Sequence, residues 1–126
     1  MLAGAPRRRA PDRLALQAAI IHHLEWCVLF NEHLSIEGPE QSPPAPLPNA
    51  AGSGLGLWLE GVRGMGGSDP DLDALTEEHQ RFHQLAMHAL AHTRQGRMDL
   101  ASTLLNTDFE RSRSRVLTLL RQMQKP

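Results

Sequence analysis

Residues 78–83 of this chain read EHQRFH, a stretch that contains two histidines four residues apart, His79 and His83. Each residue of an α-helix turns by about 100°, so this spacing places both imidazoles on one face, one turn apart. With His79 at 0°, the apolar neighbours that fall within about 80° of it are Leu72, Leu75, Phe82, Ala86, Ala89 and Leu90. Both imidazoles are therefore expected inside the buried stripe of a helix.

Buried imidazoles need partners, because an unpaired buried polar group costs about 1–3 kcal/mol. One metal ion would satisfy both rings, whereas the alternative is two core histidines bonded to backbone or water. The same segment carries a second pair, His88 and His92. This second pair falls on the opposite face of the helix and is expected to be solvated, among Glu77, Arg81, Gln84 and Gln95.

The bulk composition excludes several classes of protein. The 126 residues suffice for one domain, and 13 basic against 14 acidic residues leave no global charge that would attract nucleic acid or a membrane. The single cysteine excludes an internal disulfide and fits a reducing compartment, so we expect a cytoplasmic protein. Met1–Arg13 lacks the apolar core of a secretory signal, and no apolar run is long enough for a bilayer.

Upstream of the histidine stretch, residues 1–11 read as a flexible arm and Asp12 as the N-cap of a helix that ends near Leu34. One stripe of this helix surrounds His23 and contains Leu16, Ala19, Ile20, Trp26, Cys27, Phe30 and Leu34. Its other side is also apolar, with Leu14, Ile21, Leu24, Val28 and Leu29. A helix that is apolar on two sides packs against more than one neighbour, so we predict a homodimer with this helix at the interface.

The remaining chain also indicates helices. Residues 38–56 are rich in proline, and a short apolar helix over Leu55–Glu60 stops at Gly61 or at residues 64–67. Ser68 or Asp69, followed by Pro70, starts a helix that ends at Gly96, and a final helix runs from about Met98 to Met123. The stripe of the final helix comprises Leu105, Phe109, Ser112, Val116, Leu119, Leu120 and Met123. With no strand pattern, the predicted fold is all-α: one domain over residues 12–126, an antiparallel bundle of three long helices and one short helix.

Bundles build metal sites from inward side chains on facing helices, and here His23 would face His79 and His83. Neutral imidazole is a common zinc ligand. Cys27, one turn after His23, would complete a tetrahedron of three nitrogens and one sulfur. The alternative reading of Cys27 is a small buried hydrophobic residue. The predicted site is thus a Zn²⁺ centre of His23, His79, His83 and Cys27.

Four segments in this order resemble the chemoreceptor zinc-binding domain family. The first is Ala19-x-x-x-His23-x-x-Trp26, and the second, Leu55-Gly56-x-Trp58, is similar to a family Cys-x-Leu-Gly-x-Trp segment. The third runs from Pro70 through His79 and His83 to Ala86, and the fourth from Arg97 to Leu104. Together the resemblance covers roughly residues 12 to 123.

The resemblance implies an all-helical, usually dimeric bundle that binds zinc through three histidines and one cysteine. It also implies a regulatory role in chemotaxis or diguanylate cyclase signalling, in which zinc occupancy or cysteine oxidation changes the signal. This chain departs from the family because Ser53 takes the place of the family cysteine. The fourth ligand is then Cys27 or water, or the site is degenerate. The chain has no output domain attached, so a separate signalling partner is expected.

Three rival readings remain. The first is a metal-free structural dimerisation module whose site has decayed. The second is a zinc enzyme with three histidine ligands, but no glutamate follows His79 in the His-Glu-x-x-His spacing, and we expect no enzyme. The third is a di-iron bundle, which needs bridging carboxylates and a His-x-x-x-Glu motif. Here that motif occurs only from His33 to Glu37, at the end of the first helix.

Overall fold

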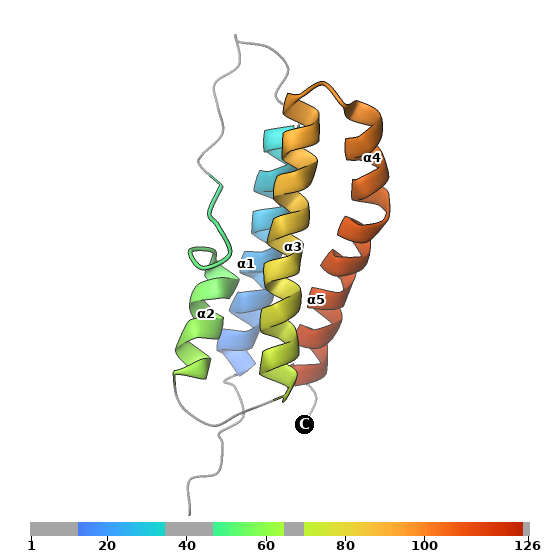
Figure 1. The fold of residues 1–126 in the computed structure, drawn as a ribbon. Helices are drawn as coiled ribbons and strands as arrows, with labels where there is room; N and C mark the ends of the chain where they lie inside the picture. Colours follow the sequence, from blue (N-terminus) through green and yellow to red (C-terminus); the bar gives the residue numbers. More distant parts are fainter. Residues whose placement is uncertain (1–12, 35–46, 65–69, 125–126) are drawn as a thin grey trace, which may run out of the picture.

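Successive helical segments of the chain run antiparallel to one another in the computed structural model, which describes residues 13–34, 47–64 and 70–124 (Figure 1). The elements are α1 (Arg13–Leu34), α2 (Gly54–Arg63), α3 (Pro70–Arg94), α4 (Met98–Asn106) and α5 (Asp108–Gln124). No strand occurs in these three described ranges. The predicted all-α bundle is confirmed, with α4 and α5 together forming the last long helical segment.

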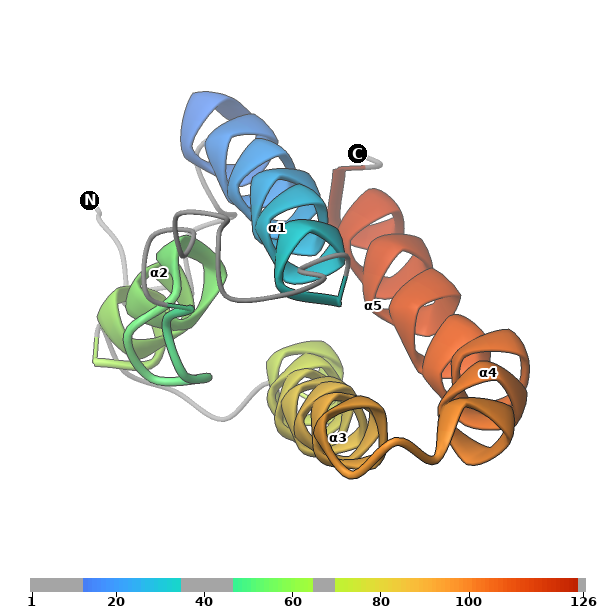
Figure 2. The same cartoon turned by 90° about the horizontal axis from the view of Figure 1, so that it is seen from above.

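Seen along its axis, the bundle places α1 and α3 across from each other, with α2 on one flank and α5 on the other (Figure 2). Side chains from all four meet in one core, and the large residues that are fully buried there include Leu16, Phe30, Leu55, Leu75, Phe82, Leu90 and Leu120. The apolar stripes predicted for the first, third and last helices are the ones that contribute to this core. The helical period of the sequence thus determines which faces pack together.

Local sequence signals set the ends of α3. Pro70 occupies its first position. Asp71 and Asp73 lie in the first turn, where their negative charges interact favourably with the positive end of the helix dipole. At the other end Gly96 adopts a φ of 76°, and the Arg97 amide donates to the His92 carbonyl at 2.8 Å. Glycine accommodates this left-handed turn without the steric cost of a side chain. The predicted caps Asp12, Ser68 and Asp69 lie outside the described residues, as do the arm and residues 38–46.

The last helix differs from its prediction, because Thr107 divides it into α4 and α5. Thr107 has φ −122° and ψ −96°, and its hydroxyl donates to the Thr103 carbonyl at 2.7 Å. The Asn106 side-chain amide donates to the Ser102 carbonyl at 2.9 Å. Such side-chain bonds to the backbone compete with the helical ladder and bend helices. Thr107 therefore marks a break where the apolar period of the sequence gives no sign of one.

Candidate metal centre

Three histidines lie in the core between α1 and α3. The exposed fractions of His23, His79 and His83 are 2%, 3% and 6%, so each of the three predicted burials is confirmed. His23 comes from α1 and the other two come from α3, one helical turn apart. Two facing helices thus supply the three imidazoles to one buried region.

Aromatic side chains enclose these imidazoles. The ring centroids of His79 and His83 are 4.6 Å apart, and the two planes are nearly perpendicular at 82°. The Trp26 ring lies 4.3 Å from His83, and the Phe82 ring lies 4.9 Å from His23. Phe82 in turn contacts both Trp26 and Phe109. Aromatic rings therefore line the site on the sides of Trp26 and Phe82.

Burial keeps all three imidazoles neutral at physiological pH. Desolvation lowers the pKa of His23 to about 4, with smaller lowering contributions from His79 and Arg113. Desolvation also lowers the pKa of His79 to about 4. The pKa of His83 falls to about 3, first through burial and then through the charges that His79 and His23 would carry. A neutral imidazole has a free ring nitrogen lone pair, which is the form that binds a metal.

One ring nitrogen of the cluster is left without a hydrogen bond. His23 Nε2 is buried and has no partner among the described residues. A buried polar atom in this state costs about 1–3 kcal/mol, so the position calls for a water molecule or a metal ion. This orphaned nitrogen is the observation that best fits the predicted metal site.

Ser53 lies beside the histidines. Its hydroxyl oxygen is 3.3 Å from His79 Nε2 and 3.1 Å from the Ala50 carbonyl. It also accepts the Gly56 amide at 3.0 Å, which makes Ser53 the N-cap of α2. Ser53, at the position that the sequence resemblance aligns with a cysteine, is thus 3% exposed and in contact with a predicted ligand.

The segment before α2 holds Ser53 in place. The Trp26 indole donates to the Pro48 carbonyl at 2.8 Å, which ties this segment to α1. Gly56 allows the turn to close, because a Cβ there would overlap the Ala50 carbonyl oxygen. Gly54 likewise leaves room for the His22 side chain of α1. These close approaches explain why small residues flank Ser53 in the sequence.

Cys27 lies one turn after His23 on α1 and packs against the core, close enough to α5 for two of its charged residues to affect the thiol. Its thiol is half-buried, and burial raises its pKa to about 11, while Arg113 lowers the pKa and Glu110 raises it. Both charged residues belong to α5. The fourth residue after His23 is rotated from it by about 40° around the helix, which accounts for the neighbourhood of Cys27 on the α5 side. Coordination by this thiol stays a prediction.

The candidate ligands are not arranged as a preformed tetrahedron. In the described parts of the chain, no group of three or more His, Cys, Asp or Glu side chains is poised to hold a metal ion. The donor set nevertheless fits zinc, because three neutral buried imidazoles are available and one has an unpaired nitrogen. Metal binding would require these side chains to move from the positions that they occupy here.

A polar contact between α3 and α5 was not predicted from the sequence. The Ser112 hydroxyl donates to the Glu78 carboxylate at 2.6 Å, and the Arg115 Nε lies 3.4 Å from the same carboxylate. Glu78 immediately precedes His79, so this contact fixes the turn that carries the candidate ligands. A signal was present, since Ser112 is the one polar residue within the apolar stripe of the last helix.

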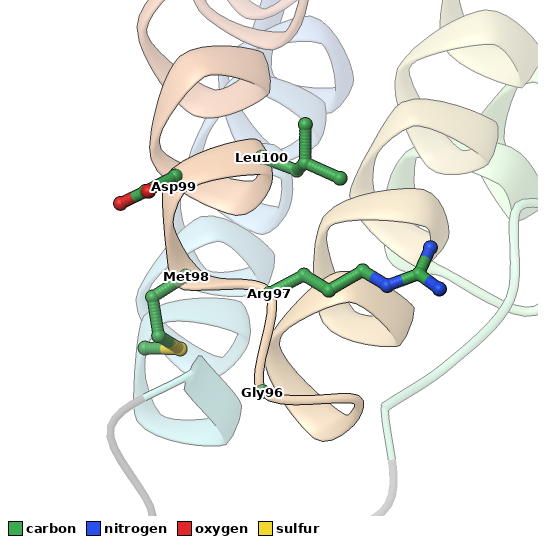
Figure 3. A pocket seen from close by; sticks show the side chains of 5 residues that line it. All are labelled: Gly96, Arg97, Met98, Asp99 and Leu100. Atoms are coloured by element: carbon green, nitrogen blue, oxygen red, sulfur yellow. The ribbon is translucent and has the colours of Figure 1, made fainter.

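The other histidine pair occupies the outside of α3. His88 is exposed, as predicted, but His92 is half-buried. A surface hollow of about 320 Å³ lies just beyond the end of α3, lined by residues 96–100. Figure 3 shows these residues at the corner between α3 and α4, with the Arg97 side chain extended toward α3. The hollow contains none of the candidate zinc ligands.

Comparison with profiles of protein families, with curated proteins and with solved structures finds no match. The resemblance to the chemoreceptor zinc-binding domain therefore rests on the four sequence segments alone. The described helices include none that is long and apolar enough to cross a membrane.

Proposed function

We propose that the chain is a zinc-binding regulatory module of the chemoreceptor zinc-binding type. His23 of α1 and His79 and His83 of α3 would hold the ion. The observation that carries the proposal is the buried cluster of three neutral imidazoles, one of which has an unpaired Nε2. Core histidines that were purely structural would be expected to have every buried ring nitrogen hydrogen-bonded.

Two positions compete for the fourth ligand. Cys27 is the prediction from helical spacing, and a water molecule beside Ser53 is the alternative. The 3.3 Å contact between Ser53 and His79 supports the second arrangement. A bound zinc ion would act as a cross-link between α1 and α3, and the three histidines would keep their neutral form to hold it.

Regulation fits this site better than catalysis. Among the described residues, the three histidines are almost fully buried and packed against Trp26 and Phe82, which disfavours contact with a substrate. A metal that cross-links two helices changes the stability and geometry of the bundle. A partner protein can bind the metal-loaded and metal-free states with different affinity. We accordingly propose a cytoplasmic protein, not an enzyme, that acts on a separate partner in a chemoreceptor or diguanylate cyclase pathway.

Zinc binding is the direct test. Protein purified without a histidine tag is expected to hold one zinc ion per chain, and His79→Ala is expected to abolish this binding. Zinc is expected to raise the melting temperature of the wild type and leave that of His79→Ala unchanged. The matched control is His88→Ala on the outer face, which should retain both the tight zinc ion and the thermal shift.

The outcome also separates the rival readings. Absence of zinc binding in wild-type protein would leave a metal-free dimerisation module, and two irons per chain would indicate a di-iron bundle. If His79→Ala and His88→Ala lose zinc binding to the same extent, the assignment of His79 and His83 as the buried, zinc-binding pair is refuted. Elemental analysis and calorimetric titration at equimolar zinc supply these measurements.

The partner that we propose for α1 is a second copy of the chain. Leu14, Ile21 and Val28 recur every seven residues on its outer face and are 73%, 54% and 59% exposed. Leu24, at 42% exposure, follows Ile21 by three residues, as the second position of a coiled-coil seam requires. β-Branched Ile21 and Val28 at first positions with Leu24 at a second position are the combination that favours two strands, whereas the other second positions are Gln17 and Asn31.

Sedimentation equilibrium at micromolar concentration is expected to give a homodimer. Ile21→Lys places a charge in the centre of the seam and is expected to give a folded monomer. The matched control, Leu57→Lys, replaces a residue of α2 that is 63% exposed and lies off the seam, so it should remain dimeric. A wild-type monomer under these conditions would refute the proposed dimer.

A further inference from the structure

The outer face of α3 carries two histidines that the proposed zinc centre does not use. His88 is exposed and His92 is half-buried, and both belong to the uninterrupted helix Pro70–Arg94. Side chains at this spacing have Cβ atoms about 5–6 Å apart. Two histidines four residues apart on one helical face are a known arrangement for binding a single metal ion.

No charged residue of α3 lies at helical spacing from the pair, whereas Arg97, just beyond the end of the helix, extends toward α3 (Figure 3). The residues three and four positions from either histidine are all uncharged: Gln84, Leu85, Ala89, Ala91, Gln95 and Gly96. No carboxylate in this register supplies a third ligand, and no lysine or arginine in it repels a cation. The two imidazoles would thus be the only protein ligands from α3, with water in the other positions.

The backbone holds the end of the helix that carries His92. The His92 carbonyl accepts the Arg97 amide at 2.8 Å and the Gln95 amide at 3.2 Å. Gly96, with a φ of 76°, closes this turn. The last turn is therefore fixed in the conformation that keeps His88 and His92 one above the other. The negative end of the helix dipole also favours a cation here.

We propose that His88 and His92 form a second metal site, on the surface, which takes a divalent transition metal and prefers Cu²⁺. Imidazole suits copper, nickel and zinc, and at a given nitrogen site copper is bound most tightly of the first-row divalent ions. Binding of the first imidazole brings the second within reach, which raises affinity above that of a lone histidine. The proposal goes beyond the zinc centre and does not depend on it.

The test uses full-length protein without a tag, in a His79→Ala background that disables the proposed zinc centre. Calorimetric titration with Cu²⁺ is expected to show a site that disappears in His88→Ala and in His92→Ala. Electron paramagnetic resonance is expected to show two nitrogen donors at this site. Circular dichroism checks that every variant remains helical.

Spacing variants provide the matched controls. Ala91→His combined with His88→Ala keeps the number of histidines but places the pair at adjacent positions, which do not face each other on a helix, so the site should be lost. Gln84→His combined with His92→Ala restores a four-residue spacing one turn earlier, so the site should return. Both replaced positions, Ala91 and Gln84, are exposed. Retained Cu²⁺ binding in His88→Ala, or equal binding by the two spacing variants, would overturn the proposal. The zinc centre is tested in a separate titration, in which zinc is added to protein that retains His79, so the two proposals can fail independently.

Discussion

Acidification of the metal-free protein from about pH 6.5 to pH 4 is expected to unfold the bundle. The pKa values of His23 and His79 fall to about 4 and that of His83 to about 3, against an ordinary value near 6.5. In this window the unfolded chain binds protons that the folded chain does not, so stability decreases as the pH falls. Above pH 6.5 both states are neutral at these positions, and the contribution of the histidines to stability is fully present.

The expected size of this effect is large for a domain of this length. A pKa lowered from 6.5 to about 4 corresponds to about 3 kcal/mol for each histidine at acidic pH. Three such groups together approach the whole stability of a typical domain, about 5–15 kcal/mol. Far-UV circular dichroism of chelator-treated protein, recorded against pH, measures the transition.

Apolar replacement of one buried histidine sharpens this test. His23→Leu removes one group that must be protonated, together with the unpaired Nε2, and is expected to move the acid transition to lower pH. His88→Leu on the outer face is the control and should leave the transition where it is. A metal-free protein that keeps its helices unchanged down to pH 4 would contradict the burial of neutral histidines.

Ser53→Cys is expected to raise zinc affinity by more than about tenfold, because a thiolate is a much better zinc ligand than a hydroxyl or water. The contact between Ser53 and His79 places this side chain beside one of the proposed ligands. The substitution also removes the N-cap of α2, at a cost of about 1 kcal/mol. Ser53→Ala loses the same cap without gaining a ligand, so the comparison isolates coordination. Competition titration against a zinc chelator gives the affinities.

The Cys27→Ser variant decides between the two candidates for the fourth position. If the fourth position lies beside Ser53, Cys27→Ser changes zinc affinity little, and zinc does not protect the thiol from alkylation. If Cys27 is the ligand, its substitution weakens binding by orders of magnitude, and Ser53→Cys gives no gain. X-ray absorption of the zinc-loaded wild type and of zinc-loaded Ser53→Cys shows whether sulfur, or only nitrogen and oxygen, surrounds the ion.

Periodicity alone was enough to predict the fold and the burial of the histidines. A helical wheel of the segment around His79 separates the buried pair from exposed His88, because burial follows the period of the apolar residues. The same wheel placed His92 on the opposite, solvated face, but this residue is half-buried. His92 lies in the last turn of α3, where the chain turns toward α4, and a helical wheel does not contain such contacts between elements.

Local side-chain bonds and tertiary contacts account for what the sequence did not predict. The break at Thr107 arises from local side-chain bonds that the apolar pattern does not record. The contact of Ser53 with His79 joins residues 26 positions apart in the chain. Spacing could relate Cys27 to His23 on one helix, but it could not show that Arg113 and Glu110 of α5 are its charged neighbours. Ser53 drew attention only through the family resemblance.

Helix α1 contains neither glycine nor proline between Arg13 and Leu34, so it has no point at which it bends easily. His23 lies on its inner face, whereas Ile21 and Val28 lie on its outer face. A displacement of the α1 backbone at His23 would therefore carry the outer face with it rather than bend the helix, whereas rotation of the imidazole alone would leave the helix in place. A shift of α1 that begins at the buried histidine would in this way reach the surface that we propose as the dimer interface.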